Sequence, residues 1–202
     1  MESASEDDRR TRRSTRRQMI EKKKERDELI RAASSLEDPL DRVGSELCYH
    51  QSGLSVHFKS GCGDNLSCTL KQFISKLLKL NMERHYGMEW KIEERVKYRE
   101  MLAPEARYIF ALDTTFAEKS ILFPTKGSED TIVGFVHYRF TMEEEVPVLY
   151  LYELQLVPHV QGKGLGEFMM QLLELIARKM TAEKNYEILC KAFDHESQAK
   201  LE

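Results

Sequence analysis

One stretch, residues 148–180, constrains the fold more than any other part of this 202-residue chain. It begins with an apolar run rich in β-branched, aromatic and aliphatic side chains, which favours a strand. Pro158 ends that run because proline cannot donate to a sheet ladder. From Leu165 to Met180 the apolar residues recur with helical spacing, which predicts an amphipathic helix. The stretch therefore predicts a strand, a tight glycine-containing turn and a helix.

The turn has the composition of an anion-binding loop. N–H groups in the first turn of a helix lack intrahelical partners and the helix dipole favours negative charge there, so a phosphate or pyrophosphate suits the position. The spacing is not the G-x-G-x-x-G of dinucleotide-binding loops, and no Ser or Thr follows Lys163 as the Walker loop requires. What fits is Q-x-x-G-x-G after a strand, at Gln161, Gly164 and Gly166.

This pattern resembles the coenzyme A loop of the GCN5-related N-acetyltransferases. The flanks, residues 150–156 and Phe168, are similar to those of the histone-specific N-α-acetyltransferases of the NatD type. The similarity continues over most of the chain, at residues 38–40, 81–82, 89–90, 138–140 and Phe193. It implies the α/β acetyltransferase (GNAT) fold, a mixed and mostly antiparallel sheet flanked by helices, with acetyl-CoA as the acetyl donor. The alternative is a glycine turn that joins a strand to a helix and binds nothing.

By resemblance, the strand and the turn would bind the cofactor. Acetyltransferases of this kind have a bulge and a splay at this strand, which free backbone N–H groups for the pantetheine and the thioester carbonyl. The turn would hold the pyrophosphate, and Lys163 would add positive charge. The residues assigned to the cofactor are Gln155, Leu156, Val157, Gln161, Gly162, Lys163, Gly164, Leu165 and Gly166.

Glu153 is the candidate general base. A free α-amine has a pKa of about 8, so a single general base suffices to remove its proton at neutral pH. The amine can then attack the thioester directly in a ternary complex. A carboxylate in the middle of an apolar strand is costly unless it is paired or functional. The alternative is a buried ion pair with an Arg or Lys. Strict alternation puts Tyr152, the second candidate catalytic residue, on the face opposite Glu153.

The resemblance also implies the acceptor, the Ser-Gly-Arg-Gly-Lys terminus shared by histones four and two-A. Tyr86 and Tyr152 would cradle the amine, and Trp90 would wall the pocket. Carboxylates suit arginine because they accept its planar fork at two points. The family's Asp is replaced by Thr141, so Glu144 and Glu145 would supply charge, although a solvated turn is the alternative there. The substrate-binding set is Tyr86, Trp90, Thr141, Met142, Glu143 and Tyr152.

The N-terminal leader differs in charge from the rest. Residues 1–33 hold eleven Lys or Arg against eight Asp or Glu, which leaves residues 34–202 with a net charge of −6. Residues 1–8 have no pattern that could bury anything and are expected to be disordered. The six arginines of residues 9–17 suit nucleic acid, an acidic protein surface or an import receptor, and a solvated tail is the alternative. Residues 18–34 favour a helix lying against the body.

The remaining chain is read as one acetyltransferase domain, residues 34–202. Helical periodicity predicts helices over residues 66–85 and 89–102, and apolar runs predict strands at 54–58, 107–112, 131–140 and 186–193, with the rest of 40–65 irregular. An acidic connection, residues 141–147, joins two of the strands. The family continues past residue 202 with a further helix and two strands, which predicts a shortened C-terminal part. Residues 193–200 would begin that helix, with Glu196 and Lys200 departing from the family pattern.

Composition narrows the function classes. No apolar run approaches the roughly 18 residues of a membrane helix, and the first residues lack a signal peptide's apolar core. The four cysteines show no C-x-x-C spacing, which predicts free thiols and no metal site. We expect a monomeric acetyltransferase of the cytoplasm and nucleus. A lysine or small-amine acetyltransferase of the same fold, or a non-catalytic binding module that acts through its leader, remains open.

Overall fold

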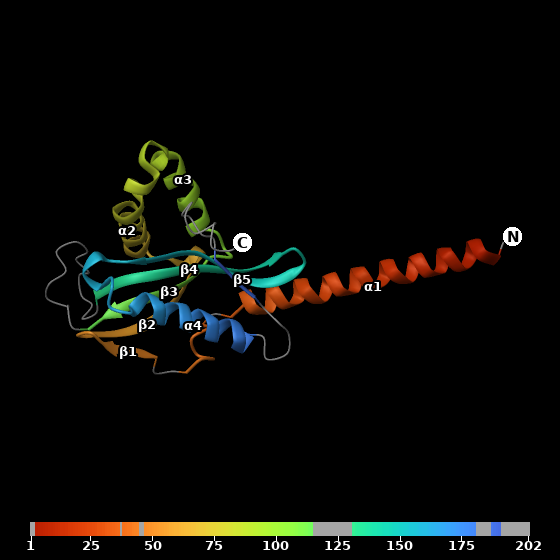
Figure 1. Cartoon of the computed structure of the whole chain (residues 1–202), viewed down its shortest axis with the longest axis horizontal. Helices are drawn as coiled ribbons and strands as arrows, with labels where there is room; N and C mark the ends of the chain where they lie inside the picture. The colour runs from red at the N-terminus through yellow and green to blue at the C-terminus, as the bar shows by residue number, and fades with distance from the viewer. Residues whose placement is uncertain (1–2, 37, 45–46, 115–130, 181–186, 191–202) are drawn as a thin grey trace.

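The computed structural model describes residues 3–36, 38–44, 47–114, 131–180 and 187–190 (Figure 1). The expected start of a further helix at residues 193–200, with Glu196 and Lys200, lies outside the described residues. So do residue 186 and residues 191–193 of the strand expected at 186–193.

One sheet of six strands forms the centre of the molecule, in the order β1-β2-β3-β4-β5-β6. Neighbouring strands are antiparallel from β1 to β5, and β6 runs parallel to β5. This confirms the predicted α/β class with a mixed, mostly antiparallel sheet. The strands are β1 (Cys48–Gln51), β2 (Leu54–Cys62), β3 (Arg107–Asp113), β4 (Thr131–Glu143), β5 (Val146–Leu156) and β6 (Glu187–Cys190).

Helices cover both faces of the sheet (Figure 1). On one face stand α2 (Cys68–Tyr86) and α3 (Trp90–Met101), joined by a 3-10 turn, and on the other lies α4 (Leu165–Met180). All three agree with the predicted helices to within about two residues. Ser67 caps α2 because its hydroxyl accepts a hydrogen bond from the Leu70 N–H at 3.2 Å.

The core lies on both sides of the central strands. Under α2, the buried Phe73 meets Phe135 of β4 edge-on, with ring centroids 6.5 Å apart. Under α4, the predicted apolar face is buried. Each such side chain contributes roughly 1.5–3 kcal/mol. The α4 residues with at most 3% exposure are Leu165, Met169, Leu172, Leu173, Ile176 and Ala177.

The region expected to be irregular, residues 40–65, instead contains a β-hairpin. Strand β1 was missed, and β2 extends four residues beyond the predicted end at Phe58. The turn consists of Ser52 and Gly53, both with positive φ (53° and 74°), the geometry that matches the twist of two antiparallel strands. The high glycine content of this region hid the short alternation of β1.

A second correction concerns the acidic connection. Strand β4 runs on to Glu143 and β5 begins at Val146, so only Glu144 and Glu145 form the turn, with φ of 45° and 67°. Residues 141–147 are therefore mostly strand, because Thr141, Met142 and Val146 continue the pairing of the hairpin.

The leader forms one 32-residue helix, α1 (Ser3–Ser34), which extends far from the body (Figure 1). The prediction of disorder for residues 1–8 is wrong from Ser3 on; acidic residues suit a helix N-terminus, and the arginines that follow are good helix formers. The expected contact of residues 18–34 with the body is confirmed from Arg26 on: Arg26 pairs with Glu145 of the β4–β5 turn, Ala33 is buried, and Arg107 donates to the Ser34 carbonyl. No helix within the described ranges has the length and apolar character needed to cross a membrane.

Candidate active site

A β-bulge at Tyr152 decides which side chains meet on the sheet. His137 of β4 pairs with Glu153 and Tyr138 pairs with Leu151, so Tyr152 is an extra residue on β5. The bulge breaks the alternation that would have put Tyr152 and Glu153 on opposite faces. Both side chains contact partners on the α2/α3 face: Tyr152 stacks on His137, and Glu153 pairs with Lys97 of α3. The expected bulge is confirmed, and the expected separation of the two candidates is wrong.

Four side chains from three elements form what we call the polar cluster: Asn81, Lys97, Glu153 and Gln155. Lys97 donates to Glu153 Oε1, and Gln155 Nε2 donates to Glu153 Oε2 at 2.9 Å. Asn81 Nδ2 donates to Gln155 Oε1 at 2.8 Å and to the Leu156 carbonyl at 3.1 Å. Lys97 and Glu153 are 6% and 7% exposed, so the buried ion pair considered as an alternative for Glu153 is present.

Aromatic rings surround this cluster. The Tyr152 ring lies 4.8 Å from the imidazole of His137, and the Arg139 guanidinium lies 4.5 Å from its centroid. Tyr86 and Trp90, two predicted substrate residues, lie together with centroids 6.1 Å apart. The Lys97 ammonium lies 5.5 Å from the Tyr86 centroid, so Tyr86 borders the polar cluster.

Burial and charge tune the ionisable groups of the site. Burial disfavours the charge of Lys97, but the Glu153 carboxylate outweighs it and raises the Lys97 pKa above its usual value. Burial, assisted by Arg139 and Lys97, lowers the pKa of His137 to about 3. Burial also raises the pKa of the Tyr86 hydroxyl. The cluster is thus a charged pair beside a neutral imidazole at physiological pH.

Three buried polar atoms at this site make no hydrogen bond to any described residue. They are Trp90 Nε1, His137 Nε2 and Arg139 Nε. A buried donor without a partner costs roughly 1–3 kcal/mol, so such atoms tend to mark places where a ligand or water binds. Here they border the same charged pair, which suits a polar ligand.

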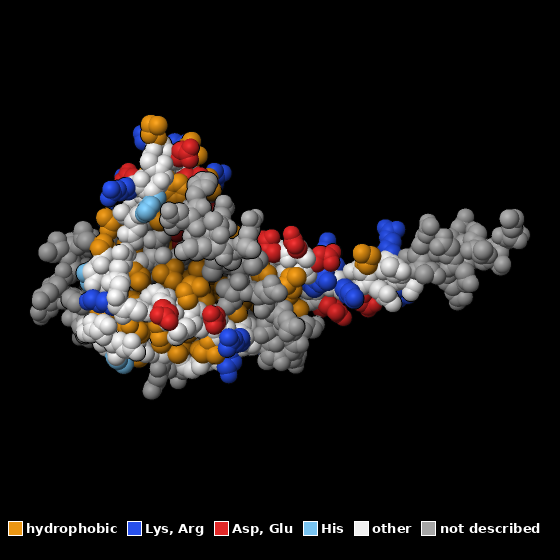
Figure 2. Space-filling model, viewed as in Figure 1, with side chains coloured by type: hydrophobic (Ala, Val, Ile, Leu, Met, Phe, Trp, Pro, Cys, Tyr) orange, Lys and Arg blue, Asp and Glu red, His pale blue; other side chains and the backbone are white. Residues whose placement is uncertain are grey.

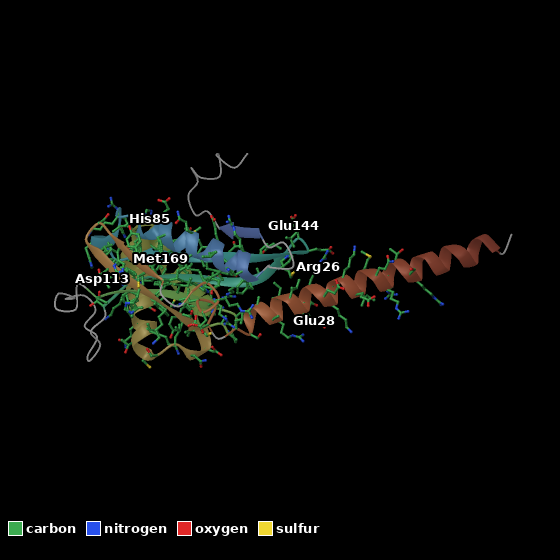
Figure 3. All side chains as sticks on the ribbon, turned by 90° about the horizontal axis from the view of Figure 1, so that it is seen from below. Arg26, Glu28, His85, Asp113, Glu144 and Met169 are labelled. Atoms are coloured by element: carbon green, nitrogen blue, oxygen red, sulfur yellow. The ribbon has the colours of Figure 1, made fainter. Side chains whose placement is uncertain are left out.

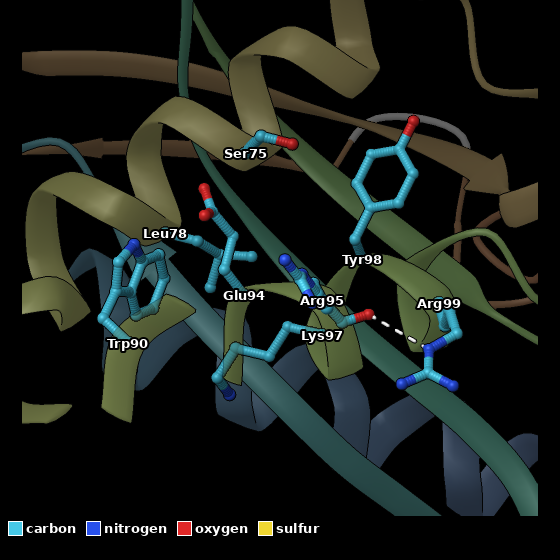
Figure 4. Close-up of a pocket in the computed structure, with 8 residues that line it drawn as sticks. All are labelled: Ser75, Leu78, Trp90, Glu94, Arg95, Lys97, Tyr98 and Arg99. Carbon is cyan, nitrogen blue, oxygen red and sulfur yellow. Dashed lines mark hydrogen bonds between the residues drawn. The ribbon is translucent and has the colours of Figure 1, made fainter. Parts of the chain in front are cut away.

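A cavity of about 510 Å³ opens between α2 and α3 (Figure 4). Its wall contains Trp90 and Lys97 of α3 and Leu78 of α2, and the other lining residues are Ser75, Glu94, Arg95, Tyr98 and Arg99. The cavity therefore borders the polar cluster at Lys97. Within the described ranges, no group of three or more His, Cys, Asp or Glu side chains could hold a metal ion.

The glycine turn, residues 161–166, follows β5 through a 3-10 turn (Pro158–Val160). Gln161 Nε2 donates to the Leu156 carbonyl at 2.8 Å, and Tyr49 of β1 donates to the Lys163 carbonyl, so two side chains fix its path. Gly162 and Gly164 have φ of 68° and 83°, which favour glycine. A Cβ on Gly164 would lie 2.8 Å from the Tyr49 hydroxyl.

The N–H groups of the turn are free for a ligand. None of the N–H groups of residues 162–166 donates a hydrogen bond to a described residue, and the first internal donor is Phe168, to the Gly164 carbonyl at 3.1 Å. The 16-residue helix α4 begins at Leu165, so its positive end lies at the same place. This geometry is a nest for a diphosphate.

The backbone groups of Leu156 and Val157, before the turn, make more hydrogen bonds within the protein than the resemblance implied. The Val157 N–H donates to the Val133 carbonyl at 2.9 Å, and the Val157 carbonyl accepts from Val160. The Leu156 carbonyl accepts from Asn81 and Gln161. Along the described part of β6, pairing with β5 stops at Leu151, one residue before the bulge, so the edge from Tyr152 on faces no described strand.

The remaining predicted substrate residues lie towards the tip of the β4–β5 hairpin. Alternation puts Thr141 and Glu143 on the face of Arg139 and His137, whereas Met142 lines a groove beside α1. Glu145, expected to compensate for the missing acid, instead binds Arg26 of α1 at 3.0 Å. Figure 3 shows Arg26 near the turn that carries Glu144. The charge of Glu145 is therefore shared with the leader.

Sequence reasoning missed four residues of the site: Asn81, Lys97, His137 and Arg139. A signal existed for Lys97, because it falls on the apolar side of α3, in helical register with the buried Trp90 and Met101. A charged residue on a buried helix face requires a partner, and Glu153 was the unpaired buried acid. The other three have no signal in spacing, since their partners lie far away in sequence.

Comparison with known families decides what kind of protein has this arrangement. The model of the acetyltransferase (GNAT) family matches residues 80–199, more than half of the chain. The chain belongs to the acetyltransferase (GNAT) family. Within the matched region this acetyltransferase has strands β3 to β6, the bulge of β5 and the Q-x-x-G-x-G turn, and the family uses acetyl-CoA as donor.

Several solved structures are similar to this acetyltransferase at low identity. A possible acetyltransferase from Clostridium difficile 630 is 10% identical, with 72% of this chain and 86% of that chain covered and a TM-score of 0.46. The ribosomal-protein-alanine N-acetyltransferase from Brucella melitensis biovar Abortus 2308 is 14% identical, with 72% and 87% covered and a TM-score of 0.43. At these identities, neither structure identifies the acceptor of this chain.

The residues of this acetyltransferase fit coenzyme A. The N–H groups of residues 162–166, which donate to no described residue, and the helix dipole suit its diphosphate. The edge of β5 from Tyr152 on, which faces no described strand, suits an extended arm. Of the nine residues predicted for the cofactor, those of the turn fit directly. Gln155 belongs to the polar cluster through its side chain, and both backbone groups of Val157 are already bonded.

Proposed function

We propose that this protein acetylates the N-terminal α-amine of a polypeptide, and that its acceptor is the Ser-Gly-Arg-Gly-Lys terminus of histones four and two-A. The observation that carries the proposal is the bulge at Tyr152, which brings Tyr152 and Glu153 onto one face together with Tyr86 and Trp90. A carboxylate and two tyrosines on the same face of the sheet suit a terminal amine. The NatD resemblance supplies the acceptor sequence.

Glu153 can act as base although it is paired. A carboxylate has about four lone-pair sites, and Lys97 and Gln155 use one on each oxygen, so an incoming amine or its water can still donate to Glu153. Acetyl-CoA supplies the activated acetyl group when bound. Lys97 pairs with the carboxylate and fixes its position, and Glu153 removes the proton that the amine must lose. Tyr152, fixed between His137 and Arg139, positions the amine.

The hairpin offers a path for the rest of the peptide. Thr141 lies four residues from His137 along β4, about 13 Å, on the same face. The third residue of an extended peptide lies about 7 Å from the first, and the long arginine side chain extends further in the same direction. Glu143 and Thr141 are thus suitable partners for that guanidinium. Histone acceptors are consistent with a protein of the cytoplasm and nucleus.

A peptide assay tests this proposal. The enzyme is given acetyl-CoA with a Ser-Gly-Arg-Gly-Lys peptide, the same peptide already acetylated at its N-terminus, or a small polyamine. We expect acetylation of the first peptide only, located on the α-amine by mass spectrometry. Acetylation confined to the blocked peptide or the polyamine would instead identify a lysine or small-amine acetyltransferase and refute the proposed acceptor.

A further inference from the structure

Most of the surface of helix α1 is exposed. Its buried contacts with the body lie at its C-terminal end, where Ala33 is 3% exposed and Ile30 is half-buried. Further along, Arg26 pairs with Glu145, and Lys23 lines a groove beside Met142 and Glu145 of the hairpin. All side chains from Arg13 to Glu25 are exposed. Figure 1 shows this part of the helix projecting away from the tip of the β4–β5 hairpin. A helix whose side chains are mostly exposed either binds a partner through them or is a solvated arm.

The charges of this exposed part are segregated. Arg13, Arg16, Arg17, Lys23 and Lys24 are spaced at i, i+3, i+4, i+10 and i+11. At 100° per residue they fall within about 120° of the helix circumference, and we call them the basic stripe. Glu21 and Glu25 fall outside that sector. Figure 2 shows blue side chains along this part of the arm.

The composition of the arm narrows the kind of partner. Arg and Lys side chains without intervening acids suit a row of phosphates. Membrane-surface helices need a large apolar face, and from Arg13 to Glu25 the only large apolar residues are Met19 and Ile20. A coiled-coil partner needs an apolar seam, and single-stranded nucleic acid needs aromatic rings for stacking. Neither occurs along this stretch.

We propose that α1 is a DNA-binding arm whose basic stripe lies along the phosphates bordering the major groove of duplex DNA, independently of base sequence. An α-helix with its side chains is about 10–12 Å across, and the major groove of B-DNA is about 12 Å wide, whereas that of A-form RNA is too narrow and deep for side chains to read. The inference goes beyond the proposed activity, since it concerns a surface that lies away from the polar cluster.

Salt dependence of binding tests the arm quantitatively. Fluorescence anisotropy of a labelled random-sequence 20-base-pair DNA duplex is measured with the whole chain from 50 to 200 mM salt. If all five stripe residues contact phosphate, they contribute about −4.5 to the slope of log K against log salt. Lys24→Ala should make the slope about 0.9 less steep, and the triple variant Arg13→Ala, Arg16→Ala, Arg17→Ala about 2.7 less steep.

Lys22 provides a matched control. It is two residues from Lys24, equally exposed, and about 160° away around the helix, outside the basic stripe. Lys22→Ala should leave the slope unchanged. Equal changes for Lys22→Ala and Lys24→Ala, no binding at 50 mM salt, or tighter binding to an RNA duplex or to anionic vesicles would each overturn the proposal. Circular dichroism verifies that the variants keep the helix, and Glu153→Gln should bind DNA like the parent, which separates this test from the fate of the proposed activity.

Discussion

The polar cluster lies near the C-terminal end of β5, and the glycine turn follows that strand. The two regions nevertheless use different groups to bind their ligands. The turn offers backbone N–H groups from consecutive residues, and two side chains, Tyr49 and Gln161, hold its path. The cluster offers side chains collected from α2, α3 and β5. Backbone chemistry suits a donor that is the same throughout the family, whereas side-chain chemistry can be changed residue by residue to suit an acceptor.

The largest expected effect comes from breaking the ion pair of the cluster. Lys97→Met leaves the 7%-exposed Glu153 without its cation, which should lower the free energy of unfolding by about 3–5 kcal/mol. The double variant Lys97→Met, Glu153→Met should recover most of this loss because no charge is left buried. Urea denaturation measures both. A single variant as stable as the parent would mean that the pair does not hold α3 to the sheet.

Substituting a glycine of the turn should weaken coenzyme A binding by straining the backbone. Gly164→Ala combines a positive φ with a contact to the Tyr49 hydroxyl, and we expect coenzyme A affinity to fall by about 1–3 kcal/mol, up to roughly 100-fold, by calorimetry. Gly162→Ala has the strain but open space around its Cβ, so its loss should be smaller. Adding Tyr49→Phe to Gly164→Ala should recover part of the loss. Equal losses for both glycines would show that the contact with Tyr49 is irrelevant.

Asn81 tests whether the two regions are independent. Asn81→Ala removes the hydrogen bonds that Asn81 donates to Gln155 Oε1 and to the Leu156 carbonyl. The Leu156 carbonyl still accepts a hydrogen bond from Gln161. We expect a loss of about 1–2 kcal/mol in kcat/KM for the peptide, because Gln155 no longer aligns Glu153. Coenzyme A affinity should change far less. A larger change in cofactor affinity than in peptide kinetics would contradict this division.

The last expected effect is a pH dependence of stability. His137 is neutral in the folded protein, with its pKa lowered to about 3, whereas its unfolded pKa is about 6.5. The unfolded state therefore binds more protons below pH 6.5, so stability falls as the pH falls, by about 1.4 kcal/mol per pH unit. His137→Phe keeps a ring between Tyr108 and Tyr152 but cannot titrate. Its stability between pH 6.5 and 4.5 should fall less than that of the parent, by denaturation at each pH; parallel curves would contradict the assignment.

What the sequence predicted well is local. The strand, the glycine turn and α4 follow one another within 33 residues, and spacing alone identifies them. The β1–β2 hairpin was missed because a four-residue strand among glycines carries almost no pattern. The bulge at Tyr152 could be expected only from the family, since alternation by itself predicts the wrong face for Glu153. Lys97, His137 and Arg139 belong to the site through pairings across the sheet, and no sequence window contains them with their partners.

One kinetic measurement tests the shared face most directly. The single-turnover rate of acetyl transfer to the Ser-Gly-Arg-Gly-Lys peptide is measured for the double variant Glu153→Gln, Tyr152→Phe at saturating acetyl-CoA. We predict a fall of roughly 10²–10⁴-fold with unchanged coenzyme A affinity, because the base and its neighbour are lost while the turn is intact. A rate equal to that of the parent would show that the reaction does not depend on the two residues that the bulge brings together.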